Sequence, residues 1–323
     1  DLRVVMPHVL GAYEAKQINL VKEYCNSKNI DFDCIWDWTL IDDIDLSKLS
    51  LGFSSFRKKV EKNMRVSEPI KPLRSIPNYL NDFTCVSDVF NRAQLSTNGF
   101  QTGGEISATD HLTDYVWTSN AIGHYKKTRN KLIGNHFSSK LSAYLSHGCL
   151  SARRIYHTIR EFESKVDKNE STYWLIFELL WRDFFQFQYL KHHHSWFSFG
   201  GIQQKEWPAP EIDQHKRMDW ASGNTGNDFI NANMLELINT GYMSNRGRQN
   251  AASYLIHDLG QDWRFGAAVF EHYLIDYDVA SNIGNWMYIA GVGNSAQMRI
   301  FNVVEQQKRY DRSLTFTNHW LHK

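Results

Sequence analysis

Two scarcities in this sequence each exclude a class of protein. The 323 residues contain only four cysteines (Cys25, Cys34, Cys85 and Cys149), and no two of them form a CxxC pair. Cysteines this scattered argue against a disulfide scaffold or a zinc site and favour a reducing, intracellular compartment. An excess of one charge is also lacking, because 36 Lys and Arg face 35 Asp and Glu. This balance excludes a globally basic coat for nucleic acid, so any basic surface must be local.

Long apolar runs are absent as well. No uncharged stretch approaches the roughly 20 residues that a membrane-spanning helix needs. The most apolar stretch, residues 173–190, is interrupted by Glu178, Arg182 and Asp183. The first residues lack a signal peptide and an initiator methionine. We therefore predict no membrane anchor and expect this sequence to begin inside a longer protein.

Aromatic residues, by contrast, are abundant, with 11 Trp, 15 Tyr and 19 Phe. A hydrophobic fraction of 42% beside 22% charged residues is typical of a folded protein with a core. Since a core can be built from Leu and Val, the surplus of rings indicates stacking surfaces, a flat cofactor or electron transfer.

The chain divides into three predicted parts. Residues 1–50 carry one helical pattern, at 15–28, and one short strand pattern, at 32–36. These two elements cannot bury both faces of a sheet, so we interpret them as the remnant of an α/β domain. Residues 51–100, which hold a cluster of prolines without clear periodicity, are predicted to be an interdomain linker.

Residues 101–323 carry helical patterns only, and the predicted fold class is therefore mainly α. We expect a helical domain whose longest helix is apolar almost all round and fully buried. The predicted helices cover residues 171–191, 228–239, 248–259, 264–277 and 302–309.

The predicted helix 171–191 contains the first candidate site. Glu178, Trp181 and Arg182 lie on one face at spacings of three and four residues. A solvated Glu–Arg surface pair is the ordinary interpretation, but this helix is too apolar for it, and a buried charge needs a partner. We therefore favour a functional site, because perturbed carboxylates cluster at such sites.

Two further segments could bind an anion. Residues 245–250 place Arg246 and Arg248 at a predicted helix start, where backbone N–H groups favour negative charge. Residues 138–142 offer serine hydroxyls and the Lys140 ammonium just ahead of a short helix. A phosphate cradle and a common serine-rich helix cap both remain open for this second segment.

Residues 276–286 bring acid, amide and indole groups together, although turn-forming Asn and Gly also suit a solvated loop. The three adjacent histidines His192, His193 and His194 would point in different directions on a helix. Since no acidic or Cys partner stands at a metal-ligand spacing, no metal site is predicted.

These segments closely resemble the photolyase/cryptochrome family, and within it the cryptochrome DASH branch. The resemblance is strongest at residues 241–254, 262–264 and 276–294. It extends in the family's order through residues 103–105, 125–134, 138–142, 148–151, 178–185 and 299–302. Residues 100–312 are covered densely, and such a collinear set is highly specific.

The resemblance implies a helical domain that holds a U-shaped FAD. The residues expected around the phosphates are Tyr125, Ser138, Ser139, Lys140, Leu141 and Ser142. Those expected around the adenine and isoalloxazine are Glu178, Arg182, Asp183, Asn245, Arg248, Asp276, Asp278 and Asn282. Asn282 would face the flavin N5, and Arg248 and Asp276 would form an ion pair over the ring. Trp220, Trp263 and Trp286 match the family's tryptophan chain, which carries an electron to photoexcited oxidised flavin.

The family's chemistry is the repair of cyclobutane pyrimidine dimers, which are flipped into a pocket over the flavin and split by an electron from excited reduced FAD. By motif position, Glu178 would hydrogen-bond the dimer and stabilise its radical anion. Trp181 would stack on it and Arg246 would contact a phosphate. Gln249 and Tyr288 are the occupants typical of DASH proteins, whose looser pocket goes with repair mainly of single-stranded DNA.

The sequence also departs from the family. Only residues 9–46 match the antenna domain, and Val9 stands where a glutamate usually contacts a folate, which argues against a folate antenna. Leu235 and Gln186 replace usual arginines, and prolines and an aspartate are replaced at Ala143, Asp228 and Asn231. These changes suggest weaker DNA contact.

Three functions remain open: a repair lyase, a blue-light receptor that signals through partner proteins, and a flavin-bearing remnant that binds nucleic acid without turnover. Glu178, Trp181, Asn245 and Arg246 favour repair, because signalling needs only the flavin and the electron path. No long tail of the kind that signalling receptors carry follows Trp320. We predict a monomeric lyase that acts on dimer-containing DNA.

Overall fold

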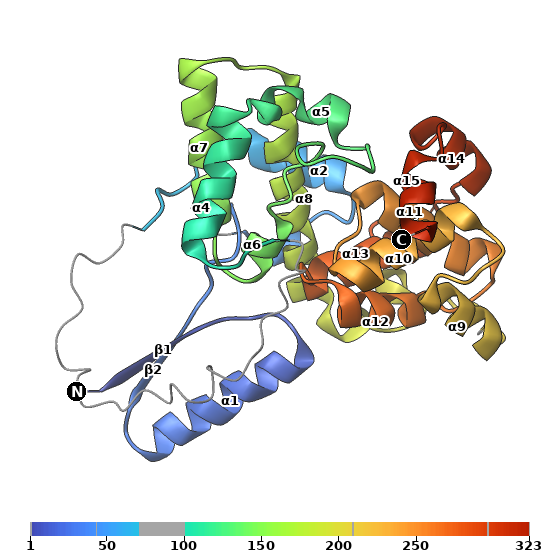
Figure 1. Ribbon diagram of the computed structural model, residues 1–323. Coiled ribbons are helices and arrows are strands. Elements are labelled where there is room, and N and C mark those ends of the chain that lie inside the picture. The colour runs from blue at the N-terminus through green and yellow to red at the C-terminus, as the bar shows by residue number, and fades with distance from the viewer. Residues whose placement is uncertain (1, 43, 71–100, 209, 296, 323) are drawn as a thin grey trace, which may run out of the picture.

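The molecule is mostly helical, with one small sheet at its edge (Figure 1). This computed structural model describes residues 2–42, 44–70, 101–208, 210–295 and 297–322. The mainly α fold class is confirmed. Cys85 and most of the predicted linker lie outside the described residues.

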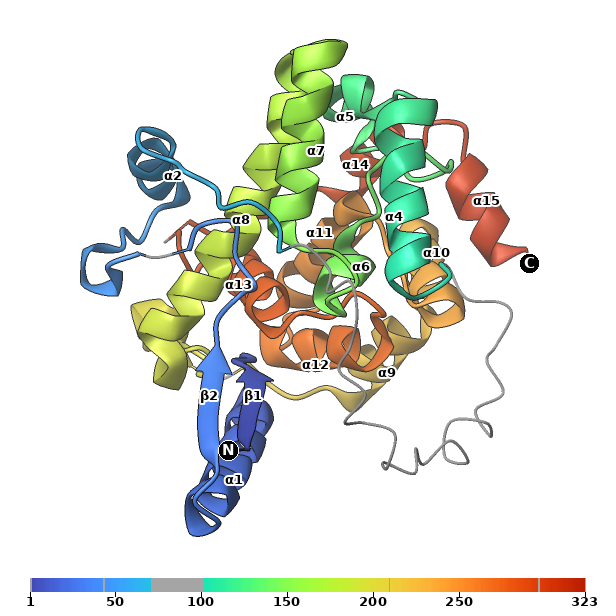
Figure 2. The same cartoon turned by 90° about the vertical axis from the view of Figure 1, so that its left-hand side faces the viewer.

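The N-terminal residues form one parallel βαβ unit. Strand β1 (Arg3–Pro7) pairs with β2 (Asp31–Ile35), and α1 (Ala12–Ser27) connects them. The sequence analysis predicted α1 and β2 but missed β1, whose five residues are too few for a clear alternation. Both views place the unit at one edge of the molecule, beside rather than within the helical body (Figures 1 and 2).

The chain then runs back along the helical body. After the short η1 turn (Leu46–Lys48), helix α2 (Phe53–Glu61) buries Phe53 and Phe56 against helix α8 (Glu170–His192). The expectation of a linker from residue 51 therefore needs a correction, because residues 53–61 form a packed amphipathic helix.

Helix α8 lies at the centre of the helical body. Asn169 and Thr172 form a capping box at its start, and its 23 residues include buried side chains on several faces. The helix is largely buried, but the predicted full burial is only partly met, because Trp174, Phe177, Glu178, Trp181 and Arg182 are half-buried. Glu178 and Arg182, the polar residues of this less buried side, line a cavity.

Some of the other helices pack directly on α8, and the rest pack on one another. Before it lie α4 (Glu105–Thr113), η3 (Asp114–Thr118), η4 (Ala121–His124), α5 (Tyr125–Thr128), α6 (Ser142–Ser146) and α7 (Ala152–Lys165). After it lie η5 (His193–Ser195), η6 (Gly201–Gln203), α9 (Gln214–Ser222), α10 (Asp228–Thr240), α11 (Asn245–Ser253), η7 (Tyr254–Asp258), α12 (Trp263–Tyr273), α13 (Val279–Ala290), α14 (Val303–Tyr310) and α15 (Thr315–Leu321). None of the helices in the described ranges has the length and apolar character that crossing a membrane requires.

Two predicted helices end differently from the expectation. The predicted helix 248–259 is α11 followed by η7, a single π-helical turn. The predicted helix 264–277 ends as α12 at Tyr273, because Leu274 adopts an extended conformation with φ −72° and ψ 121°. Residues 274–278 consequently form a loop, which brings Asp276 and Asp278 to the side of a cavity.

Candidate functional site

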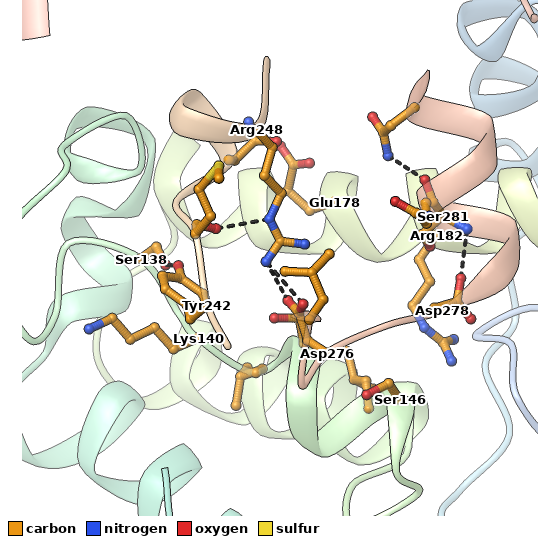
Figure 3. Close-up of a pocket in the computed structure, with 18 of the residues that line it drawn as sticks. Ser138, Lys140, Ser146, Glu178, Arg182, Tyr242, Arg248, Asp276, Asp278 and Ser281 are labelled. Atoms are coloured by element: carbon orange, nitrogen blue, oxygen red, sulfur yellow. Dashed lines mark hydrogen bonds and ion pairs between the residues drawn. The ribbon is translucent and has the colours of Figure 1, made fainter. Parts of the chain in front are cut away.

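A cavity of about 290 Å³ lies between α8, the turn before α6, and helices α11 to α13 (Figure 3). This volume is close to the lower limit of ligand pockets, about 300 Å³. Its apolar wall includes Leu175, Leu179, Phe270 and Trp286. The predicted cofactor residues that line it are Tyr125, Ser138, Ser139, Lys140, Leu141, Ser142, Glu178, Arg182, Asn245, Arg248, Asp276, Asp278 and Asn282. Apolar walls with a few converging polar groups are typical of a cofactor site.

One end of the cavity is the turn of residues 138–142. Lys140 has a left-handed φ of 51°, and Leu141 follows with a right-handed φ of −82°. Successive residues of opposite hand turn their N–H groups toward one concave side, where an anion can bind. No side chain caps α6, whose first flanking residue is Leu141. The turn therefore favours the phosphate interpretation over the helix cap.

The middle of the cavity holds the predicted ion pair. Arg248 Nη2 lies 3.0 and 2.8 Å from the two Asp276 carboxylate oxygens, and Arg248 Nε donates to the Met243 carbonyl at 2.8 Å. The Asp276 side chain is only 2% exposed. The guanidinium thus allows a carboxylate to stay charged in a largely apolar wall.

The start of α13 supplies the far end of the cavity (Figure 3). Asp278 caps this helix by accepting a hydrogen bond from the Ser281 N–H at 2.7 Å. Asn282 is buried, and its Nδ2 donates to the Ala267 carbonyl at 2.9 Å. This bond fixes the orientation of the amide at the cavity wall. Trp286 lies one helical turn further and lines the same cavity.

Helix α8 contributes Glu178 and Arg182. Glu178 pairs with Arg129, a cavity residue to which the sequence analysis gave no role. Burial raises the pKa of Glu178, and the Arg129 charge opposes this shift. Arg182 donates to the Trp38 carbonyl and so ties the N-terminal segment to the cavity wall. Arg129 stands inside the family-like segment 125–134, but only the fold reveals its partner 49 residues away.

The three predicted electron-transfer tryptophans lie in the region of α9, α12 and α13. The ring centroids of Trp286 and Trp220 are 6.1 Å apart. Trp220 is fully buried, and its Nε1 donates to the Ala251 carbonyl at 3.0 Å. Trp263 is also buried and donates to the Phe199 carbonyl at 3.0 Å. Trp286 thus joins the cavity to a buried aromatic region.

A second pocket adjoins the first, and Gln249 lines both. Its remaining lining is Arg246, Tyr288, Met298, Arg299, Ile300 and Phe301. The Arg246 guanidinium lies 4.7 Å from the Tyr310 ring, and that of Arg299 lies 5.0 Å from the Tyr288 ring. No carboxylate belongs to this lining, as far as the described residues show. Cations and aromatic rings without acids suit phosphates and bases.

Two predicted site residues on α8 lie elsewhere. Asp183 is fully buried and accepts hydrogen bonds from the Leu40 and Ile41 N–H groups at 3.0 and 2.9 Å, so it holds the N-terminal segment instead of lining the cavity. Trp181 stacks on Phe53 with ring centroids 3.7 Å apart and lines neither pocket. A helix turns by about 100° per residue, which places Asp183 on the side of α8 away from Glu178. Trp181 shares the side of Glu178, and it is the stack on Phe53 that directs its ring toward α2.

The adjacent histidines follow the geometry expected from the sequence. His192 ends α8, His193 and His194 belong to η5, and the rings of these last two lie at 88° to each other. Across the part of the chain that the structure describes, no group of three His, Cys, Asp or Glu residues could hold a metal ion.

Comparison with known proteins identifies the family of this chain. Residues 174–323 match the model of the FAD binding domain of DNA photolyase. Cryptochrome DASH of Synechocystis sp. is 43% identical over 316 residues, which cover 94% of this chain and 64% of the relative. Cryptochrome DASH of Danio rerio is 40% identical over 97% of this chain and 63% of its own length. This chain therefore spans somewhat less than two thirds of these relatives.

Comparison with solved structures leads to the same family. The Synechocystis sp. cryptochrome superimposes with a TM-score of 0.85 and 38% identity, over 98% of this chain and 68% of that one. A class III photolyase from Agrobacterium tumefaciens, 23% identical, shares the fold with a TM-score of 0.80. FAD is the cofactor of the matched domain, as the resemblance implied. The chain belongs to the photolyase/cryptochrome family, in its cryptochrome DASH branch.

Proposed function

We propose that this chain is a light-dependent lyase that uses FAD to split cyclobutane pyrimidine dimers, preferably in single-stranded DNA. The observation that carries the proposal is the position of Gln249, which lines both the cofactor cavity and the acid-free pocket of Arg246 and Tyr288. A pyrimidine dimer held in the second pocket would therefore lie next to the cofactor.

The polar groups of the first cavity suit FAD. Serine hydroxyls, Lys140 and the concave turn at residues 138–142 would hold the two phosphates. Arg248, Asp276 and Asn282 offer both donors and acceptors for a flat heterocycle, and each is fixed by a neighbouring bond. The apolar walls would cover the faces of its rings.

When bound and reduced, FAD would supply the light-driven electron transfer that splits the cyclobutane ring without net oxidation or reduction of the substrate. The chain's residues bind and orient the substrate. Glu178, whose pKa is raised by burial, would donate a hydrogen bond to a pyrimidine carbonyl in its neutral form. Arg246 would bind a phosphate beside the flipped dimer.

The preference for single strands follows from how little stacking surface the second pocket offers. Extracting a dimer from a duplex costs a few kcal/mol, which pocket contacts must offset. One face of Trp181 is covered by Phe53, and the Trp181 and Tyr288 centroids are 6.3 Å apart in an edge contact. Among the described residues, the second pocket therefore offers the rings of Tyr288 and Phe301 but not that of Trp181 for stacking, and an already unpaired dimer is the easier substrate.

One observation favours the second candidate, a blue-light receptor without repair. The stack of Phe53 covers one face of Trp181, the ring that the resemblance assigns to the dimer, whereas the Trp286–Trp220 contact lies beside the cavity as expected for electron transfer. A receptor needs only this second feature.

The two candidates separate in one experiment. The purified protein is reduced and mixed with a dimer-containing oligonucleotide, as a single strand or a duplex, and repair is followed in blue light and in darkness. We expect light-dependent repair that is faster on the single strand. Flavin photoreduction without repair of either substrate would refute the lyase and support the receptor, and equal rates on both substrates would refute the strand preference.

A further inference from the structure

A buried carboxyl group stands behind the phosphate end of the cavity. Glu236, on α10, is only 7% exposed, and its Oε2 is buried without a hydrogen-bond partner. It does not line the cavity, and neither the sequence motifs nor the proposed repair chemistry uses it. A buried carboxyl group with an unsatisfied oxygen is costly, so it calls for an explanation.

The groups that face Glu236 come from three segments. Lys140 belongs to the turn before α6, Arg248 to α11, and the Ser244 N–H to the start of α11. Between the two cations lies the Tyr242 ring, 5.9 Å from Lys140 Nζ and 5.7 Å from the Arg248 guanidinium. The Tyr242 hydroxyl lies 3.4 Å from that of Ser138, so the cluster is continuous with the predicted phosphate turn.

The charge state of Glu236 affects the net charge around the cavity. The cavity lining carries four cations (Arg129, Lys140, Arg182 and Arg248) against the carboxyl groups of Glu178, Asp276 and Asp278, so it keeps at least one excess positive charge whether Glu178 is ionised or neutral. An ionised Glu236 behind Lys140 and Arg248 would offset one such charge. A neutral Glu236 preserves it for an anionic ligand.

Burial raises the pKa of Glu236 to about 8, although the Ser244 N–H and the charges of Arg248 and Lys140 oppose the shift. Glu236 is therefore mainly a neutral acid at pH 7. Burial also raises the pKa of Tyr242, to about 12, so this phenol stays neutral over the range of interest.

We propose that Glu236 is a positioning residue for the phosphates of FAD: as a neutral acid it leaves Lys140 and Arg248 to the cofactor, and as a carboxylate it competes for them. The inference rests on the assignment of this cavity to FAD. It implies that alkaline pH weakens cofactor binding through a residue that never touches the cofactor.

The test measures FAD release from the diluted holoprotein by flavin fluorescence, at pH 7 and pH 9. If only the neutral form binds FAD well, the dissociation constant rises about tenfold between these pH values. Burial also lowers the pKa of Lys140, and loss of its charge would act in the same direction. The Glu236→Gln variant separates the two causes, because it retains Lys140 and lacks the titrating acid.

We expect nearly equal dissociation constants at both pH values in Glu236→Gln. Asp228→Asn, which removes an exposed carboxylate from the same helix, should retain the tenfold change. Should Glu236→Gln fail to fold, Glu236→Leu serves instead, because it also retains Lys140 and lacks the titrating acid, and its dissociation constant should likewise be nearly equal at both pH values. A tenfold change that persists in the folded variant would overturn the inference. A wild-type protein without FAD at either pH would instead overturn the assignment of the cavity.

Discussion

Gln249 lines both the cofactor cavity and the second pocket, but the charged side chains have different partners in these two sites. In the cavity, Asp276 pairs with Arg248, Glu178 pairs with Arg129, and Asp278 caps a helix. In the second pocket the arginines lie over aromatic rings, and no described carboxylate takes part. A site whose buried charges are mutually satisfied is stable by itself and can retain one ligand permanently. A site of cations on rings attracts a polyanion that binds and leaves, and its affinity depends on salt.

The largest effect is expected when the Arg248–Asp276 ion pair of the cavity is broken. In Arg248→Ala the Asp276 carboxylate loses its cation while remaining buried, a loss of roughly 3–5 kcal/mol. We expect this variant to purify without FAD and to unfold at a lower denaturant concentration. The visible spectrum and a denaturation curve measure the two effects.

Asp276→Asn is the matched test of the same pair. It removes the carboxylate but retains an acceptor for Arg248, so its stability should fall less than that of Arg248→Ala. Full FAD occupancy in Arg248→Ala would show that the pair does not hold the cofactor.

In the second pocket a cation can be lost without leaving an acid unpaired. Arg246→Ala should therefore retain FAD and stability but bind single-stranded DNA about tenfold more weakly, the loss expected for one phosphate contact. The slope of log affinity against log salt should become shallower by about one. Binding isotherms at several salt concentrations measure both quantities, with Arg264→Ala as the control, because Arg264 pairs with Asp262 outside both pockets. An unchanged slope would remove Arg246 from the DNA surface.

The sequence was informative where the polar groups of a site lie within one short segment. It was uninformative where contacts join distant segments. The turn at residues 138–142, the start of α11 and the loop before α13 could be recognised because each carries its polar groups within a few residues. The contact of Phe53 with Trp181 joins residues that no local pattern connects, and it covers one face of a ring that the resemblance assigns to DNA. The observed position of Asp183 differs from the expected one in the cofactor site for a related reason. Its partners are backbone N–H groups, which a sequence does not distinguish.

The same limit applies to the first third of the chain. Helix α2 follows a short turn and precedes the proline-rich stretch, and its nine residues were absorbed into the predicted linker. Only its packing on α8, through Phe53 and Phe56, identifies it as part of the helical body.

The Glu178–Arg129 pair lines the cofactor cavity. Its removal should change a pH profile more than a binding constant. Loss of the Arg129 charge allows burial to raise the pKa of Glu178 further. Because a hydrogen bond from Glu178 to the dimer requires the neutral acid, repair falls as pH rises through that pKa. In Arg129→Met the alkaline limb of the repair yield should therefore move to higher pH, as measured with the reduced protein and a single-stranded substrate. A limb that moves to lower pH would contradict this role.

The smallest effect on binding is expected at Trp286, which lines the cavity but makes no hydrogen bond or ion pair that either site depends on among those the structure records. In Trp286→Phe an aromatic ring still fills the wall, so FAD content and DNA affinity should both stay close to those of the wild type. Light-driven reduction of the oxidised flavin should nevertheless slow, because the ring that links the cavity to Trp220 has been replaced by one that is harder to oxidise. Repair by the chemically reduced protein should be nearly unchanged, since this route does not need an electron from the tryptophans. Transient absorption and a repair assay on the same preparation measure the two rates. Equal loss of both would mean that Trp286 supports the cavity structurally and that the electron enters by another path.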